Sequence, residues 1–150
     1  MGGYGGSSGK AKSNCYFDSG NHKVTDKNAI TVGEYFIDNG DYVVFLQERP
    51  PSKRADLSVS GQHIEVKGIS STSTNKIANT IKKAFEQVSA DDARYSSATN
   101  WSGEVVVLSK HGNIRTAYKA IYGGFRKAKK LGFVKGIVEM WYKDKKLIFK

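Results

Sequence analysis

The sequence has few of the residues that cross-link or break a chain. Its 150 residues include one cysteine, Cys15, and two prolines. A lone cysteine excludes an internal disulfide and a cysteine-rich zinc site, so packing alone has to hold the fold. The longest apolar runs, such as Tyr42–Leu46 and Val105–Leu108, are far shorter than the roughly 20 residues that a membrane span needs. With no signal-peptide pattern at the start either, we expect a soluble protein without a membrane span.

Acidic residues are scarce in the last part of the chain. Lys and Arg number 24 against 14 Asp and Glu, which gives a net charge of +10. The segment Lys110–Lys150 holds 12 basic residues but only two acidic ones, Glu139 and Asp144, so all of the net charge lies there. A field of one sign attracts a polyanion, either nucleic acid or an acidic protein. The alternative is a solvated lysine-rich surface.

Residues 1–14 are rich in glycine and serine, a composition that cannot bury enough apolar surface to fold. We interpret them as a flexible linker or a cloning remnant, and residues 15–150 as a single domain. Hydrophobic spacing and capping residues then predict helices over 26–38, 76–89 and 113–130, and a polar loop over 91–102. Strands are expected over 42–47, 55–60, 63–67, 104–109, 134–142 and 145–149. This order predicts an α/β fold with a mixed central β-sheet flanked by helices.

The most informative segment is the expected hairpin over 55–67, because its two faces differ in kind. With a two-residue loop at Ser60-Gly61 or at Gly61-Gln62, side-chain alternation places an apolar set on one face: Leu57, Val59, Ile64 and Val66. The other face then carries Asp56, Ser58, His63, Glu65 and Lys67. Asp56 lies opposite Glu65 in the first register and opposite Lys67 in the second.

Two carboxylates held side by side repel each other, and a divalent cation neutralises both. Oxygen ligands favour Mg²⁺ or Mn²⁺, and such a site keeps positions free for water and phosphate oxygens. Lys67, on the same face two residues from Glu65, is placed to stabilise the charge of a phosphoryl transition state. The alternative is an exposed hairpin face whose Asp, Glu and Lys form surface ion pairs of little energetic value.

The spacing Asp56-x8-Glu65-x-Lys67 resembles the PD-(D/E)xK signature of restriction-endonuclease-like nucleases. Ala55 stands where the signature has proline, a position that supplies no ligand. The resemblance implies that the mixed sheet is a restriction-endonuclease-like core and that the protein is a metal-dependent endonuclease.

The wider context resembles the tRNase and DNase toxin domains at the C-termini of contact-dependent growth inhibition (CdiA-type) proteins and related polymorphic toxins. The likeness covers about 29–109, with Glu34 in the helix before the hairpin and Gln87 in the helix after it. It implies that Asp56, Glu65 and Glu34 bind Mg²⁺, or Mn²⁺ or Zn²⁺, and that Lys67 and Gln87 complete the catalytic set. It also implies tRNA as the first substrate and DNA as the second, an acidic immunity protein as a partner, and export by a producer cell into the cytoplasm of a target cell.

The basic C-terminal part supplies the expected contacts to the nucleic-acid backbone, which release counterions and make the affinity salt-sensitive. The residues are Arg115, Lys119, Arg126, Lys129, Lys130, Lys143, Lys145 and Lys146. Gly123-Gly124 inside a helix indicates close approach of another backbone or of a ligand. His22 and His111 fall in loops with no expected partner. Two other functions stay open, a non-catalytic basic module that binds nucleic acid and a repair or mobile-element DNA endonuclease.

Overall fold

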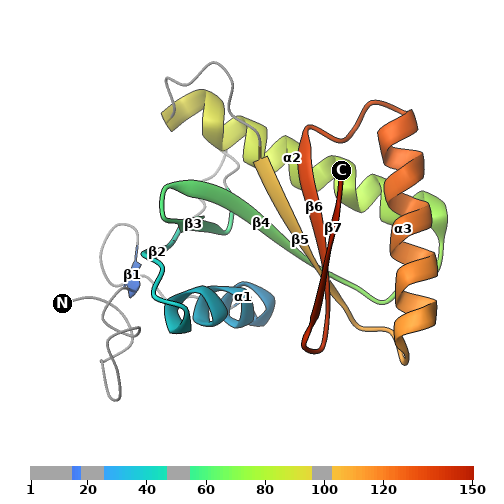
Figure 1. The fold of residues 1–150 in the computed structure, drawn as a ribbon. Helices are drawn as coiled ribbons and strands as arrows, with labels where there is room; N and C mark the ends of the chain where they lie inside the picture. Colours follow the sequence, from blue (N-terminus) through green and yellow to red (C-terminus); the bar gives the residue numbers. More distant parts are fainter. Residues whose placement is uncertain (1–14, 18–25, 47–54, 96–102) are drawn as a thin grey trace.

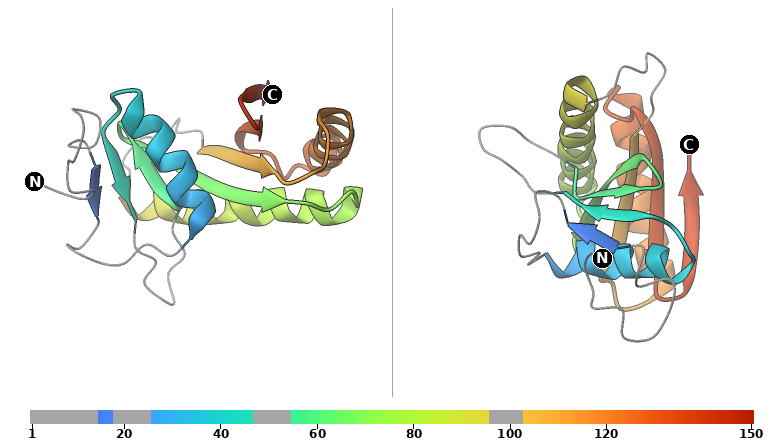
Figure 2. Two further views of the ribbon diagram at one scale, coloured as in Figure 1. Left: turned by 90° about the horizontal axis from the view of Figure 1, so that it is seen from below. Right: turned by 90° about the vertical axis from the view of Figure 1, so that its left-hand side faces the viewer.

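The computed structural model describes residues 15–17, 26–46, 55–95 and 103–150, so the expected linker over 1–14 lies outside the described part (Figure 1). The helices are α1 (Lys27–Asp38), α2 (Thr74–Tyr95) and α3 (Ile114–Lys130). The strands are β1 (Cys15–Phe17), β2 (Val43–Phe45), β3 (Leu57–Val59), β4 (Gln62–Ile69), β5 (Gly103–Ser109), β6 (Gly136–Tyr142) and β7 (Lys145–Phe149). They form one twisted seven-stranded sheet in the order β1-β2-β3-β4-β5-β6-β7 (Figure 2).

The sheet is mixed, as the sequence predicts for an α/β fold. The pairs β1–β2, β4–β5 and β5–β6 are parallel, and the other three neighbouring pairs are antiparallel. Each parallel pair formed by β4, β5 and β6 is joined through a helix, because parallel neighbours need a crossover. None of the described helices is long and apolar enough to cross a membrane.

The helix boundaries follow from capping side chains. Asp26 Oδ1 accepts hydrogen bonds from Asn28 N at 2.9 Å and Ala29 N at 3.2 Å, which starts α1 at its predicted position. At the end of α1, the C-cap Asn39 is followed by Gly40, which has a φ of +88°. Asn113 caps α3 in the same way, through a 2.8 Å bond from Thr116 N. The predicted starts of both helices are confirmed.

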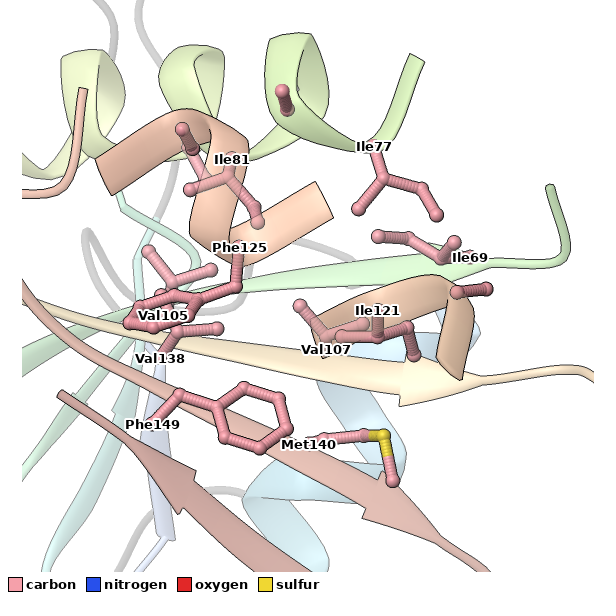
Figure 3. Close-up of a cluster of buried hydrophobic side chains, with 14 of the residues drawn as sticks. Ile69, Ile77, Ile81, Val105, Val107, Ile121, Phe125, Val138, Met140 and Phe149 are labelled. Carbon is pink, nitrogen blue, oxygen red and sulfur yellow. The ribbon is translucent and has the colours of Figure 1, made fainter. Parts of the chain in front are cut away.

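The two faces of the sheet carry separate cores. On one face α2 and α3 pack against β4–β7 through a cluster that includes Ile77, Ile121 and Phe149 (Figure 3). On the other face α1 packs against β2–β4 through a cluster that includes Val32, Ile64 and Val66. A Cβ at Gly124 would overlap the side chain of Ile77 in α2, so the predicted close approach occurs at Gly124 but is to a side chain rather than to a backbone or a ligand.

The structure differs from the sequence analysis at several boundaries and by one strand. Strands β2, β3 and β6 are shorter than predicted, and α2 begins two residues earlier. The helix expected to end near residue 89 continues to Tyr95, so the prediction of a polar loop is wrong for 91–95, and 96–102 lies outside the described residues. Strand β4 runs two residues beyond its predicted end because Ile69 pairs with Ser109 of β5. Strand β1 is not predicted, since a three-residue segment carries too little periodicity to be recognised.

Candidate active site

The hairpin adopts the first of the two predicted registers. Val59 pairs with Gln62, which leaves Ser60-Gly61 as the two-residue turn. Both turn residues have positive φ, +48° for Ser60 and +90° for Gly61, the conformation that tight hairpins favour. Pairing of β3 with β4 begins at Leu57, opposite Ile64, so Asp56 lies one residue before the paired segment and next to Glu65.

Two hydrogen bonds hold Asp56 in place, one to each of the two residues that flank Glu65 in β4. Its backbone N–H donates to the carbonyl of Ile64 at 3.1 Å, and its carboxylate Oδ2 accepts from the N–H of Val66 at 2.9 Å. The side chain therefore replaces a backbone acceptor at the end of the ladder. This arrangement fixes the Asp56 carboxylate beside that of Glu65.

Glu65 is buried, with an exposed fraction of 2%. Burial raises its pKa to about 9, the negative charge of Asp56 raises it as well, and Lys67 lowers it. Its Oε2 lies 3.0 Å from Lys67 Nζ, whereas Oε1 is buried without a hydrogen-bond partner among the described residues. The alternative interpretation of an exposed hairpin with surface ion pairs is wrong for Glu65.

Helix α2 covers this face of the hairpin and adds the amide of Gln87. Lys67 Nζ donates to Gln87 Oε1 at 2.9 Å while it contacts Glu65 on its other side. The lysine is 28% exposed, so its ammonium group meets both the buried carboxylate and solvent. The structure thus brings together Asp56, Glu65, Lys67 and Gln87, four of the five residues predicted as catalytic.

The fifth, Glu34, is not brought to the cluster. The acidic residue of the α1 region whose charge acts on Asp56 is Asp26, the N-cap. Among the described residues, no three His, Cys, Asp or Glu side chains gather as a group that could hold a metal ion. A third carboxylate ligand from Glu34 stays a prediction without a supporting contact.

The pKa of Asp56 is also raised, to about 6, because burial outweighs the hydrogen bond from Val66 that lowers it. With the pKa of Glu65 near 9, the pair cannot hold two negative charges at neutral pH on its own. Two oxygen ligands, one with a buried unpartnered atom, suit a hard cation such as Mg²⁺, which binds through one or two carboxylates and keeps several waters. The residues present therefore fit a divalent cation.

The predicted nucleic-acid contacts separate into two groups. Five share the outer face of α3: Arg115, Lys119, Arg126, Lys129 and Lys130. The C-terminal half of this helix lines a hollow of about 940 Å³ with four cations, Arg126, Lys127, Lys129 and Lys130. Lys127 is not among the predicted contacts. Its Nζ donates a hydrogen bond to the side chain of Asn75 in α2. The helical spacing of α3 alone does not predict that Lys127 belongs to this hollow.

The other group, Lys143, Lys145 and Lys146, belongs to the β6–β7 turn and the start of β7. Lys146 Nζ lies 4.1 Å from the ring centroid of Tyr35 and 4.5 Å from that of Trp141. These cation–π contacts engage the ammonium group between α1 and β6. Trp141 itself is only 5% exposed, so it belongs to the core rather than to a base-stacking surface.

His111, for which no partner is expected from the sequence, has two. Its Nδ1 lies 2.8 Å from Ser109 Oγ and its Nε2 lies 2.8 Å from the carbonyl of Ser71. Because a carbonyl only accepts, Nε2 carries the proton and Nδ1 accepts from the serine hydroxyl. The imidazole joins the loop before α2 to the end of β5. His22 lies outside the described residues.

Comparisons with known proteins add little. No family model and no curated protein matches the sequence. The chain is similar in structure to a chain of a complex described as a CdiA-CT/CdiI toxin and immunity complex from Burkholderia pseudomallei, with 17% sequence identity and a TM-score of 0.46. The similarity covers 89% of this chain and 98% of that one. Identity and TM-score at this level assign no activity, so the function has to come from the side chains of the site.

Proposed function

We propose that the protein is a metal-dependent nuclease that hydrolyses phosphodiester bonds, with a restriction-endonuclease-like core. The observation that carries the proposal is the buried Asp56–Glu65 pair joined through Lys67 to Gln87. An exposed ion pair would explain nothing about function, whereas a buried carboxylate with a free oxygen and an adjacent partly exposed ammonium group is costly for the fold. Such costs are typical of functional sites.

In this proposal Asp56 and Glu65 hold the cation. Held there, Mg²⁺ or Mn²⁺ would lower the pKa of a bound water and polarise the phosphate. The Val66 N–H keeps the Asp56 carboxylate oriented, and Gln87 keeps the ammonium group of Lys67 in the site. Lys67 then stabilises the negative charge that develops on the phosphoryl oxygens in the transition state.

The finer assignment follows from the sequence resemblance to contact-dependent toxins. It makes tRNA the leading substrate and DNA the second, and it makes an acidic immunity protein the expected partner of the basic C-terminal part. Net charge of +10 would speed association with such a partner. We propose a toxin that acts in the cytoplasm of a target cell.

The experiment uses the purified chain with total tRNA in one arm and plasmid DNA in the other. Cleavage should require Mg²⁺ or Mn²⁺, stop with a chelator and return when the metal is restored. Asp56→Asn should abolish it. Cleavage that persists in the chelator, or in Asp56→Asn, would refute the metal site, and the arm that is cut identifies the substrate.

The cationic hollow on α3 favours a second function. Four basic residues line this hollow of about 940 Å³, and such a surface attracts a polyanion whether or not cleavage follows. The protein would then be a non-catalytic nucleic-acid-binding module. Salt-dependent binding of tRNA or DNA without any cleavage, in every metal tested, would favour this function over the nuclease. Toxicity in a bacterium that is equal for wild type and Glu65→Gln would remove the toxin assignment.

A further inference from the structure

The outer face of α3 combines cations with aromatic rings. At 3.6 residues per turn, two tyrosines and five basic residues fall within about one third of the helix circumference. They are Arg115, Tyr118, Lys119, Tyr122, Arg126, Lys129 and Lys130. The opposite face packs into the core through Ala117, Ile121 and Phe125. The helix contains no Asp or Glu, so no acidic group within it offsets this field.

The two tyrosines are held parallel to each other. Their ring centroids are 5.3 Å apart with an angle of 12° between the planes. Tyr122 continues the stack toward Phe125, at 6.3 Å and 26°, and Phe149 of β7 supports both tyrosines from the side. Phe125 and Phe149 belong to the core seen in Figure 3. The stack is therefore anchored at its inner end.

The outer end of the stack is partly exposed to solvent. Tyr118 is 43% exposed, and it is the last ring of the series. Because its ring is already held by Tyr122 and Phe149, another flat group can stack on it with little further loss of side-chain freedom. An unpaired nucleobase is such a group, and stacking on an aromatic side chain is how proteins bind unpaired bases.

The surrounding charges match a nucleotide rather than a free aromatic molecule. Arg115 lies one helical turn before Tyr118, and Lys119 is the next residue. On the other side the guanidinium of Arg126 lies 5.9 Å from the ring centroid of Tyr122. Cations therefore flank the stack along the helix axis, where the phosphates on either side of a stacked base would run.

We infer that this face of α3 binds a nucleic acid with unpaired bases, with one base on Tyr118 and its flanking phosphates on Arg115, Lys119 and Arg126. The inference rests on the proposed function and narrows its substrate. Bases in a duplex are stacked on one another and offer no free face, whereas bases in a loop do. A looped RNA such as tRNA offers a base to Tyr118 as well as phosphates to the cations, whereas duplex DNA offers only its phosphates.

The test measures nucleic-acid binding in the presence of a metal chelator, which prevents metal-dependent cleavage. A fluorescently labelled RNA hairpin with an unpaired loop is compared with a blunt RNA duplex of equal charge and with a duplex DNA. Tyr118→Leu, which keeps an apolar contact with Phe149 but removes the flat ring, should weaken hairpin binding on the order of tenfold. It should leave duplex binding unchanged. Tyr118→Phe should bind as the wild type does.

Charge and stacking can be separated with Lys119→Ala. This variant should weaken binding of all three probes and reduce the salt slope by about one. Equal losses for hairpin and duplex in Tyr118→Leu, or no loss at all, would overturn the inference. If Tyr118 controls hairpin binding but no nucleic acid is ever cleaved, the proposed nuclease fails while the inference stands. If nucleic acid is cleaved but Tyr118→Leu does not change hairpin binding, the inference fails while the proposed nuclease stands.

Discussion

Two pairs of carboxyl groups lie on opposite faces of the same sheet. Asp56 and Glu65 face α2, whereas Glu104 of β5 and Glu139 of β6 alternate in step with Val106 and Trp141, which belong to the core on the α1 face. Burial raises the pKa in both places, to about 9 for Glu65 and about 7 for Glu104. A hydrogen bond between the Glu104 and Glu139 side chains and their mutual repulsion also raise the pKa of Glu104.

The difference between the pairs is what surrounds them. Glu65 has the ammonium group of Lys67 at 3.0 Å and, beyond it, the amide of Gln87. A hydrogen bond between the two carboxyl groups contributes in both pairs, but the causes of the Glu104 shift include no cation. A raised carboxyl pKa is therefore not by itself a sign of catalysis. The neighbouring cation and amide give only the first pair the means to act on a phosphate.

The largest expected effect separates the pairs by activity. Glu65→Gln should lower the rate of cleavage by at least about a thousandfold, because a cation ligand is lost. Glu104→Gln, the matched change on the other face, should cleave at the wild-type rate. Initial rates on tRNA and on plasmid DNA, at equal protein concentration, check this. If Glu104→Gln were as inactive as Glu65→Gln, the loss of activity would not be specific to the Asp56–Glu65 pair.

The next effect concerns metal binding and needs no substrate. A ligand present at about 100 times its dissociation constant stabilises the native state by about 2.7 kcal/mol, which is several degrees in Tm. Mg²⁺ should therefore raise the Tm of the wild type and of Glu104→Gln. It should leave the Tm of Glu65→Gln unchanged. Thermal unfolding with and without Mg²⁺ measures both, and a shift that survives in Glu65→Gln would place the cation elsewhere.

A smaller effect is expected for the residue that positions Lys67. Gln87→Ala should lower kcat about tenfold with KM nearly unchanged, because the ammonium group is less well held while substrate binding is retained. Glu86→Ala changes the exposed neighbour on α2 and serves as the control. Steady-state kinetics on tRNA distinguishes the two. Equal kinetics for Gln87→Ala and the wild type would leave the amide without a role.

Much of the first pair can be predicted from the sequence. Alternation along β3 and β4, together with a two-residue turn, determines which side chains share a face. This local rule is enough to group Asp56, Glu65 and Lys67. Capping residues likewise predict both ends of α1 and the start of α3, since Asp26 and Asn113 act within three residues of the chain.

The second pair and the place of Glu34 cannot be predicted, for a physical reason. Glu104 meets Glu139 only because β5 and β6 pair in parallel across a helical crossover, and nothing local in either strand encodes that register. Resemblance alone assigns Glu34 to the site, and among the described residues no group of three carboxylate, histidine or cysteine side chains forms there. Contacts between distant segments depend on packing, which periodicity does not describe.

The smallest effect uses the second pair as a probe of stability. The pKa of Glu104 is about 7 in the folded protein against 4.5 as its ordinary value, so the folded state holds a proton that the unfolded chain releases. The stability this proton contributes is complete below about pH 4.5 and is lost as the pH rises through about 7. Glu104→Gln keeps a neutral group at every pH, so its advantage over the wild type should grow across that window and then stay constant. Because the site is partly exposed, we expect a difference on the order of 1 kcal/mol, or a few degrees in Tm. Urea unfolding of both proteins at pH 5 and at pH 8, without metal, measures it, and an equal difference at the two pH values would show that Glu104 does not titrate in this window.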